Sequence, residues 1–225
     1  MDRKPLDTEI DHHTAKFIVG FIALSLAAFT DLLTPRVSIS SISLSYHLTD
    51  NARNVFVSSL CVISAFLWSY NGYSLFQAVL SKVAAVAVAA VAFFPCDCFT
   101  GRFDGGAARE ATVTGVVHTA SAISMFIILA IFCWLFYLRA RNKGSKEAKV
   151  RGLIYRVCAV AMVGAMSVQL LDILGVDFSG ITQRLTYYVE ATGLMAFGVA
   201  WMTASRMLPF ITNEDERVKI ELSGR

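Results

Sequence analysis

The chain has 225 residues, of which 56% are hydrophobic and 16% are charged. Soluble domains are about 45–50% apolar and about 25% charged, so the composition is shifted in the direction that burial in lipid requires. The formal net charge is only +3, and no basic stripe with interleaved aromatic residues runs along the chain. Nucleic acid is therefore not an expected partner.

The N-terminal segment does not resemble a cleavable signal peptide. Residues 1–16 mix bases with acids, among them Asp2, Asp7 and Glu9. The apolar run that follows is long enough to cross a bilayer and has no small-residue cleavage pattern. We therefore expect it to be a true first transmembrane helix.

Six segments are long and apolar enough to cross a membrane. A bilayer core is about 30 Å thick and needs roughly 20 apolar residues in a helix, and a segment in lipid must satisfy its own backbone hydrogen bonds. The predicted spans are about 17–34, 55–76, 78–94, 116–138, 153–175 and 187–208. No linker divides them. The sequence thus predicts one all-α integral membrane domain over residues 1–225, a polytopic transmembrane bundle of about six helices.

The stretch SISSISLSYHL, between the first two predicted helices, alternates polar and apolar residues. Alternation is typical of a β-strand, but a lone strand beside a membrane has no sheet to join. We expect a folded loop or a short interfacial helix here instead. The later loop 97–115 is rich in glycine and is predicted to be irregular.

The clearest charge signal is the loop between the fourth and fifth helices. Six bases stand there against the single acid Glu147: Arg139, Arg141, Lys143, Lys146, Lys149 and Arg151. Because loops rich in Lys and Arg stay in the cytoplasm, we expect both termini to be cytoplasmic in a bacterial inner membrane. A second interpretation is that this loop binds anionic lipid headgroups.

Several charged or titratable residues fall within the predicted spans, where a charge costs about 2.5–3.5 kcal/mol at a helix centre. Four of them, each on a different helix, lie in the outer third of the membrane in the predicted topology: Asp31, His118, Asp172 and Glu190. The outer loops add three more titratable or charged residues at this level. The sequence therefore predicts one polar ligand-binding site made of Asp31, His47, Arg53, His118, Asp172, Arg184 and Glu190. The alternative is that these groups form structural ion pairs, such as Asp172–Arg184 or Glu190–Arg53.

Two of the five cysteines, Cys96 and Cys98, lie together at the outer end of the third predicted helix. An oxidising periplasm favours a disulfide between them, although one intervening residue makes a tight ring. A metal site completed by His47 or His118 and a pair of free thiols are the alternatives. The other cysteines lie in apolar runs and are expected to act as small hydrophobic residues: Cys61, Cys133 and Cys158.

Several stretches resemble a known group of membrane proteins. They are the segment Ser38–Tyr73, the sequence FFPC at the end of the third predicted helix, and the run Glu190–Trp201. These resemble small six-helix bacterial membrane proteins and, more distantly, the FRAG1/DRAM/Sfk1 and DUF998 groups. The resemblance implies about six helices, a serine-containing loop leading into a Phe-rich second helix, and a lipid-related role.

A second comparison is with the intramembrane CREST-type hydrolases, which use zinc held by histidines beside a serine and an aspartate. Ser40, His118 and Asp172 match those residue types, but Tyr187 and Glu190 stand where the last helix would carry paired histidines. In this alternative, zinc would activate a water. Its candidate ligands are His118, Asp172, Glu190 and His47.

We therefore expect a non-enzymatic membrane protein that binds a lipid or small amphiphile in an outward-facing polar pocket, without a cofactor. Arg53 and Arg184 would meet an anionic headgroup, because a guanidinium binds phosphate with two hydrogen bonds. One alternative is an intramembrane metal-dependent hydrolase of lipid esters or amides, so that enzymatic activity stays open. Another is an accessory subunit of a larger complex. The expected partners are membrane lipids, another membrane protein or a second copy of the chain.

Overall fold

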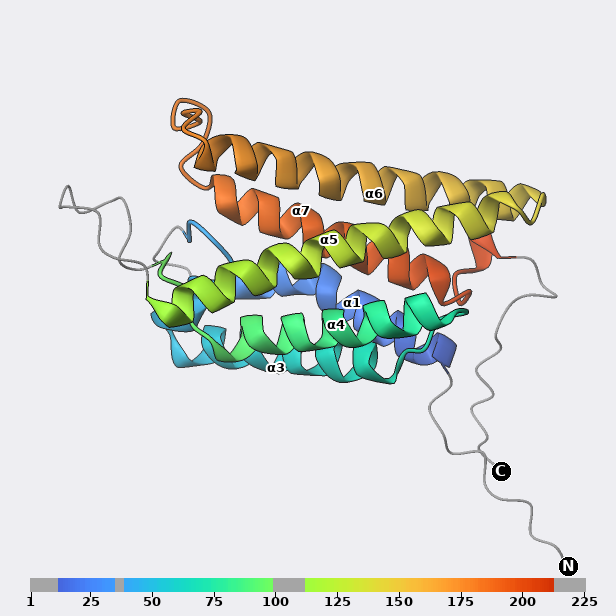
Figure 1. Cartoon of the computed structure of the whole chain (residues 1–225), viewed down its shortest axis with the longest axis horizontal. Coiled ribbons are helices and arrows are strands. Elements are labelled where there is room, and N and C mark those ends of the chain that lie inside the picture. The colour runs from blue at the N-terminus through green and yellow to red at the C-terminus, as the bar shows by residue number, and fades with distance from the viewer. Residues whose placement is uncertain (1–11, 35–38, 99–111, 213–225) are drawn as a thin grey trace, which may run out of the picture.

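A computed structural model describes residues 12–34, 39–98 and 112–212, and the rest of the chain lies outside the described part. Within these ranges the chain is helical, with no strand, which confirms the predicted all-α class (Figure 1). The elements are α1 His12–Leu32, α2 Ser45–Leu48, α3 Asp50–Ser69, α4 Leu75–Phe93, α5 Val113–Arg141, α6 Lys146–Ile173, α7 Leu185–Ala204 and the 3-10 turn Pro209–Ile211.

Five of the long helices, α1 and α3 to α6, are long and apolar enough to cross a membrane. The exception is α7, which has 20 residues but includes polar ones such as Glu190. It packs between α1 and α6 (Figure 1). The described residues thus contain five candidate membrane spans, and the sixth crossing, through α7, stays a prediction.

The structure differs from the prediction at the end of the second span. The predicted segment 55–76 runs through a turn, because α3 ends at Ser69 and α4 begins at Leu75. Gly72 has a φ of +62°, a conformation that glycine adopts without steric cost. Ser74 then caps α4 by accepting a hydrogen bond from the backbone N–H of Gln77.

A close helix contact joins α1 to α7 through two glycines. A Cβ atom built on Gly20 would lie 2.7 Å from the carbonyl oxygen of Gly198, and one on Gly198 would lie 2.6 Å from the carbonyl oxygen of Gly20. Small residues let helix backbones approach in this way inside membranes. This contact fixes α7 against α1.

An aromatic cluster in the core is centred on the fully buried Trp201 of α7. Its ring lies 4.8 Å from the rings of both Phe136 and Phe197 and 5.8 Å from that of Tyr70, measured between centroids. These contacts tie α3, α5 and α7 together. They also place the ring of Tyr70 inside the bundle.

Candidate functional site

The two ends of the bundle carry different chemistry. One, the disulfide end, holds Cys96 and Cys98 after α4 together with the first turn of α7. The other, the basic end, gathers the start of α1, the end of α7 and the α3–α4 and α5–α6 turns (Figure 1). The predicted site residues fall at the disulfide end, whereas the predicted basic loop falls at the other.

At the disulfide end, segment 39–48 is tied to the start of α7. The Nε of Arg184 donates to the carbonyl of Ile39 at 2.8 Å, and the backbone N–H of Tyr187 donates to the carbonyl of Ser40 at 2.8 Å. The first N–H groups of a helix have no partner within the helix. Segment 39–48 therefore supplies a hydrogen-bond acceptor to the first turn of α7, where the helix has none of its own.

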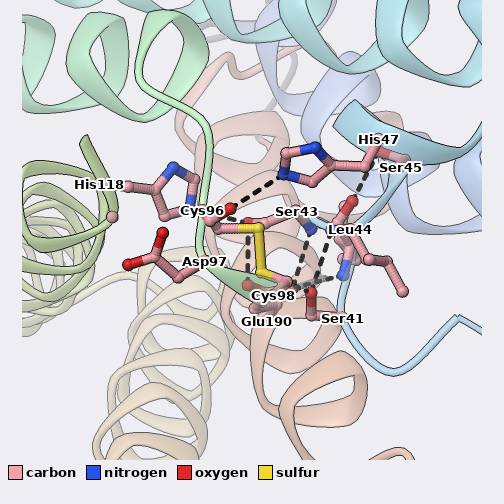
Figure 2. The surroundings of a disulfide bond; sticks show 12 residues. Ser41, Ser43, Leu44, Ser45, His47, Cys96, Asp97, Cys98, His118 and Glu190 are labelled. Carbon is pink, nitrogen blue, oxygen red and sulfur yellow. Dashed lines mark hydrogen bonds between the residues drawn. A yellow bond between two sulfur atoms is a disulfide. The ribbon is translucent and has the colours of Figure 1, made fainter. Parts of the chain in front are cut away.

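Ser43 lies at the centre of this region, between His118 of α5 and Glu190 of α7 (Figure 2). Its Oγ is 3.0 Å from Glu190 Oε1 and 3.1 Å from His118 Nε2. The other ring nitrogen of His118, Nδ1, is 2.7 Å from the carbonyl oxygen of Phe94. Two predicted site residues thus meet through a serine that was not among the predicted site residues.

The carboxylate of Glu190 also holds the backbone of segment 39–48. The N–H of Ile42 donates to Glu190 Oε2 at 2.5 Å, and that of Ser43 lies 3.4 Å from the same oxygen. The side chains of Ser43 and His118 are each only 5% exposed. Ser43 and His118 are therefore buried in a junction between α5, α7 and the segment, and Glu190 is half-buried there.

Cys96 and Cys98 form a disulfide with their Cα atoms 5.2 Å apart. The ring of His47 lies with Nε2 at 2.9 Å from the carbonyl oxygen of Cys96, and Ser41 Oγ lies 3.5 Å from Cys98 Sγ (Figure 2). Asp97, between the cysteines, accepts from the backbone and the hydroxyl of Thr112 at 3.0 and 2.6 Å. The disulfide turn therefore contacts both segment 39–48 and the start of α5.

The ion pairs differ from the two that the sequence suggested. Arg184 pairs with Asp31 at 2.5 Å, and its guanidinium lies 4.1 Å above the ring of Tyr187. Arg53 pairs with Asp50 of its own helix at 2.6 Å. The pairs observed therefore replace Asp172–Arg184 and Glu190–Arg53.

Asp172 contacts its own helix, with an oxygen 3.5 Å from Gln169 Nε2. The described residues contain no group of three or more His, Cys, Asp or Glu side chains that could hold a metal ion. His118 and Glu190 contact Ser43, whereas His47 contacts the carbonyl of Cys96. The four candidate zinc ligands thus do not converge in this part of the chain.

The basic end contains a small cavity of about 50 Å³. Among the described residues the lining contains no Asp or Glu but includes three tyrosines, Tyr70, Tyr73 and Tyr155. Five cations from separate parts of the chain also line it: Lys16, Arg139, Lys143, Arg151 and Arg206. Three of these cations belong to the predicted basic loop, but the other two come from the start of α1 and the end of α7.

Several contacts hold these cations in place. Arg139 lies 3.1 Å above the ring of Tyr73, Lys16 lies 5.4 Å from the ring of Tyr70, and Arg151 donates to the carbonyl of Ile211 at 2.8 Å. Lys16 is 6% exposed and Arg151 is 4% exposed. Lys and Arg are almost never so buried unless they interact with other groups. The buried hydroxyl of Tyr70 has no hydrogen-bond partner among the described residues.

The family model described as "Protein of unknown function (DUF998)" matches residues 17–200. The chain belongs to the DUF998 family. This confirms the predicted resemblance to DUF998 proteins, whereas the more distant link to the FRAG1/DRAM/Sfk1 group stays a prediction. No curated protein and no solved structure matches the chain.

The family match and the apolar helices together indicate that this DUF998 protein is an integral membrane protein. The matched range includes the whole Ser43 junction and most of the basic cavity. Lys16 and Arg206, which also line the cavity, lie just outside it.

Proposed function

We propose that this DUF998 protein binds an anionic membrane lipid by its headgroup, in the cavity at the basic end of the bundle. The observation that carries the proposal is the convergence of five cations, from separate parts of the chain, on one cavity. Lys16 and Arg151 are buried, and the attraction between a cation and an anion grows as the local dielectric constant falls. A phosphate group at this cavity would therefore be attracted by the cations that line it.

The chemistry of the lining suits a phosphate. Arg139 and Arg151 each carry a planar guanidinium, which can donate two parallel hydrogen bonds to phosphate oxygens. The hydroxyl of Tyr70 is buried without a partner among the described residues. Such a group costs about 1–3 kcal/mol, and a phosphate oxygen accepting from it would remove that cost.

The size of the cavity points to a headgroup phosphate rather than a whole soluble ligand. A water molecule needs about 10–15 Å³ of such space, so about 50 Å³ holds only a few waters or one small anion. Pockets for drug-sized ligands are about 300–1,000 Å³. The cavity would therefore take the phosphate, while the acyl chains stay in the surrounding bilayer.

The proposed topology places this cavity where such lipids are found. The positive-inside rule predicts that the basic end faces the cytoplasm, and the cytoplasmic leaflet is the one that carries anionic lipid. We therefore still propose a lipid ligand, as expected from the sequence, but with its headgroup at the basic end of the bundle instead of the disulfide end. Arg184, one of the two arginines first expected to bind it, already pairs with Asp31.

The test compares lipid binding by purified protein in nanodiscs of phosphatidylcholine with and without phosphatidylglycerol. Arg151→Gln removes a buried cation of the cavity, and hydrogen bonds to charged groups contribute about 1.5–3 kcal/mol. We expect phosphatidylglycerol affinity to fall at least about tenfold. The matched control is Lys149→Gln, an exposed base two residues away that does not line the cavity.

Arg139→Gln is a second test in case the first variant folds poorly. Equal retention of phosphatidylglycerol by both arginine variants and the Lys149 control would show that the cavity is not the headgroup site. A parallel titration with inorganic phosphate distinguishes a lipid headgroup site from a site for a free anion. Displacement of the lipid by phosphate at similar concentrations would favour the free anion.

A further inference from the structure

When His118 is neutral and Glu190 is ionised, the Ser43 junction has one hydrogen atom too few for all of its contacts to be hydrogen bonds. A carbonyl oxygen can only accept, so His118 Nδ1, which faces the Phe94 carbonyl at 2.7 Å, must carry a hydrogen. A neutral imidazole then has no hydrogen on Nε2. An ionised Glu190 has none on Oε1.

Ser43 has one hydroxyl hydrogen but lies within hydrogen-bond distance of two such atoms, at 3.1 Å from Nε2 and 3.0 Å from Oε1. With neutral His118 and ionised Glu190, one of these contacts would bring two lone pairs together. Both contacts can be hydrogen bonds only if one more proton is present, either on Nε2 or on Oε1. The junction then has a net charge of zero in either form.

We propose that Ser43, His118 and Glu190 form a binding site for a single proton, and that this proton fastens segment 39–48 to α7. The occupied site has two forms, with the proton on His118 Nε2 or on Glu190 Oε1, and they interconvert by proton transfer through Ser43. His118 Nε2 passes its proton to Ser43 Oγ while Ser43 passes its own proton to Glu190 Oε1. A charged pair becomes a neutral pair in this step, and no bond between heavy atoms changes.

The proton matters to the segment because Glu190 also accepts from the backbone of Ile42 and Ser43. When the proton leaves, the Ser43 hydroxyl can serve either His118 or Glu190 but not both. The other buried atom then faces a lone pair, which favours separation of the segment from α5 or α7. Release of the proton should therefore loosen the segment without unfolding the bundle.

The neighbouring titratable groups make contacts of their own. His47 contacts the Cys96 carbonyl, Asp97 accepts from Thr112, and Asp31 pairs with Arg184. Elsewhere among the described residues at this end, Asp50 and Arg53 pair with each other on α3, Asp172 lies beside Gln169 on α6, and Asp177 accepts from the backbone N–H of Ser179. None of these contacts involves Ser43, so the proton is assigned to the Ser43 junction itself.

The first test counts the proton in the wild-type protein, reconstituted in lipid at pH 7.5. Selective ¹⁵N labelling of histidine reports whether His118 is an imidazolium, and ¹³C labelling of glutamate reports whether Glu190 is a carboxylic acid. The proposal requires one of the two signals. A neutral His118 together with an ionised Glu190 would overturn it, and this measurement needs no variant that must fold.

The second test follows hydrogen exchange at the backbone amides of Ile42 and Ser43 from pH 6 to pH 9, after correction for the intrinsic exchange rate. If one proton is released on opening, the protection factor in the wild type falls tenfold per pH unit over the range in which the closed site keeps its proton and the open form has lost it, and it levels off once the closed site empties. Glu190→Gln keeps an oxygen for the Ile42 amide and supplies an N–H to Ser43 that cannot be lost at these pH values. Its protection factor should not change with pH.

Ser41→Ala is the matched control, because it removes another buried hydroxyl of the same segment without touching the proton site. It loses the contacts to Leu44 and Cys98, so protection should be lower by a constant factor at every pH, and the pH profile should match that of the wild type. Equal pH profiles for wild type and Glu190→Gln would contradict the proposal. This outcome leaves the headgroup site untouched, since that site lies at the other end of the bundle.

Discussion

Gly198→Ala tests the close contact between α1 and α7. The new methyl group would lie 2.6 Å from the carbonyl oxygen of Gly20 and 2.9 Å from the backbone nitrogen of Leu24. Carbon atoms pack best at about 3.5–4.0 Å. Because both obstructing atoms belong to the backbone of α1, no side-chain rotation relieves the overlap, and the two helices must separate by about 0.5–1 Å.

The expected cost follows from these distances. A gap of about 0.5–1 Å forfeits a quarter to a half of each contact's attraction, and overpacking typically costs about 1–3 kcal/mol. The better helix propensity of alanine returns up to about 1 kcal/mol. We therefore expect Gly198→Ala to lower the free energy of unfolding by about 1–2 kcal/mol.

The assay is unfolding of the purified protein in mixed micelles with increasing dodecyl sulfate. Gly164→Ala in α6 is the matched control, because a Cβ built there meets nothing within 4 Å. It should leave stability unchanged or raise it by up to about 1 kcal/mol. If both alanine variants shift the free energy of unfolding in the same direction and by the same amount, the overlap argument is wrong.

Three further predictions concern the two ends of the bundle. Asp31→Asn removes the ion pair with Arg184, whose side chains are 43% and 24% exposed, so the free energy of unfolding should fall by no more than about 1 kcal/mol. Tyr70→Phe removes only the buried hydroxyl and should weaken phosphatidylglycerol binding about threefold to tenfold in the nanodisc assay, without lowering stability. Deletion of residues 213–225 should strengthen that binding, because the deleted sequence begins with one neutral residue and then three acids. These acids follow Ile211, whose carbonyl contacts Arg151, by three to five residues in the sequence. Unchanged affinity after the deletion would contradict competition for the cavity.

The helices were predictable because a membrane imposes a simple rule on the sequence. Runs of apolar residues indicated all six long helices, and the error at the end of α3 arose because Tyr70 and Tyr73 extend the apolar run through the turn at Gly72. Depth along a helix follows directly from position in the sequence. That is why His118 and Glu190 could be placed at one level from their sequence positions alone.

The partners of these residues could not be predicted in the same way. Which side chains meet depends on how each helix is rotated about its axis, and sequence spacing does not determine that rotation relative to the neighbours. The importance of Ser43 was hidden in the alternation of SISSISLSYHL, where the buried serines Ser41, Ser43 and Ser45 give a strand-like pattern. The basic cavity was hidden for another reason, since Lys16 and Arg206 are far from the basic loop in the sequence.

The unequal lengths of the helices have a consequence for the depth of the cations. α4 has 19 residues and spans about 28 Å, close to the thickness of a bilayer core, whereas the 29 residues of α5 span about 43 Å. The α5–α6 hairpin accordingly extends past the α3–α4 turn at the basic end (Figure 1). The length of the two helices fixes how far the hairpin cations lie from the bilayer centre. The distance of the lipid headgroups from that centre depends instead on the thickness of the bilayer. Binding of a lipid headgroup at the basic cavity would then depend on the thickness of the membrane as well as on the charge of its lipids.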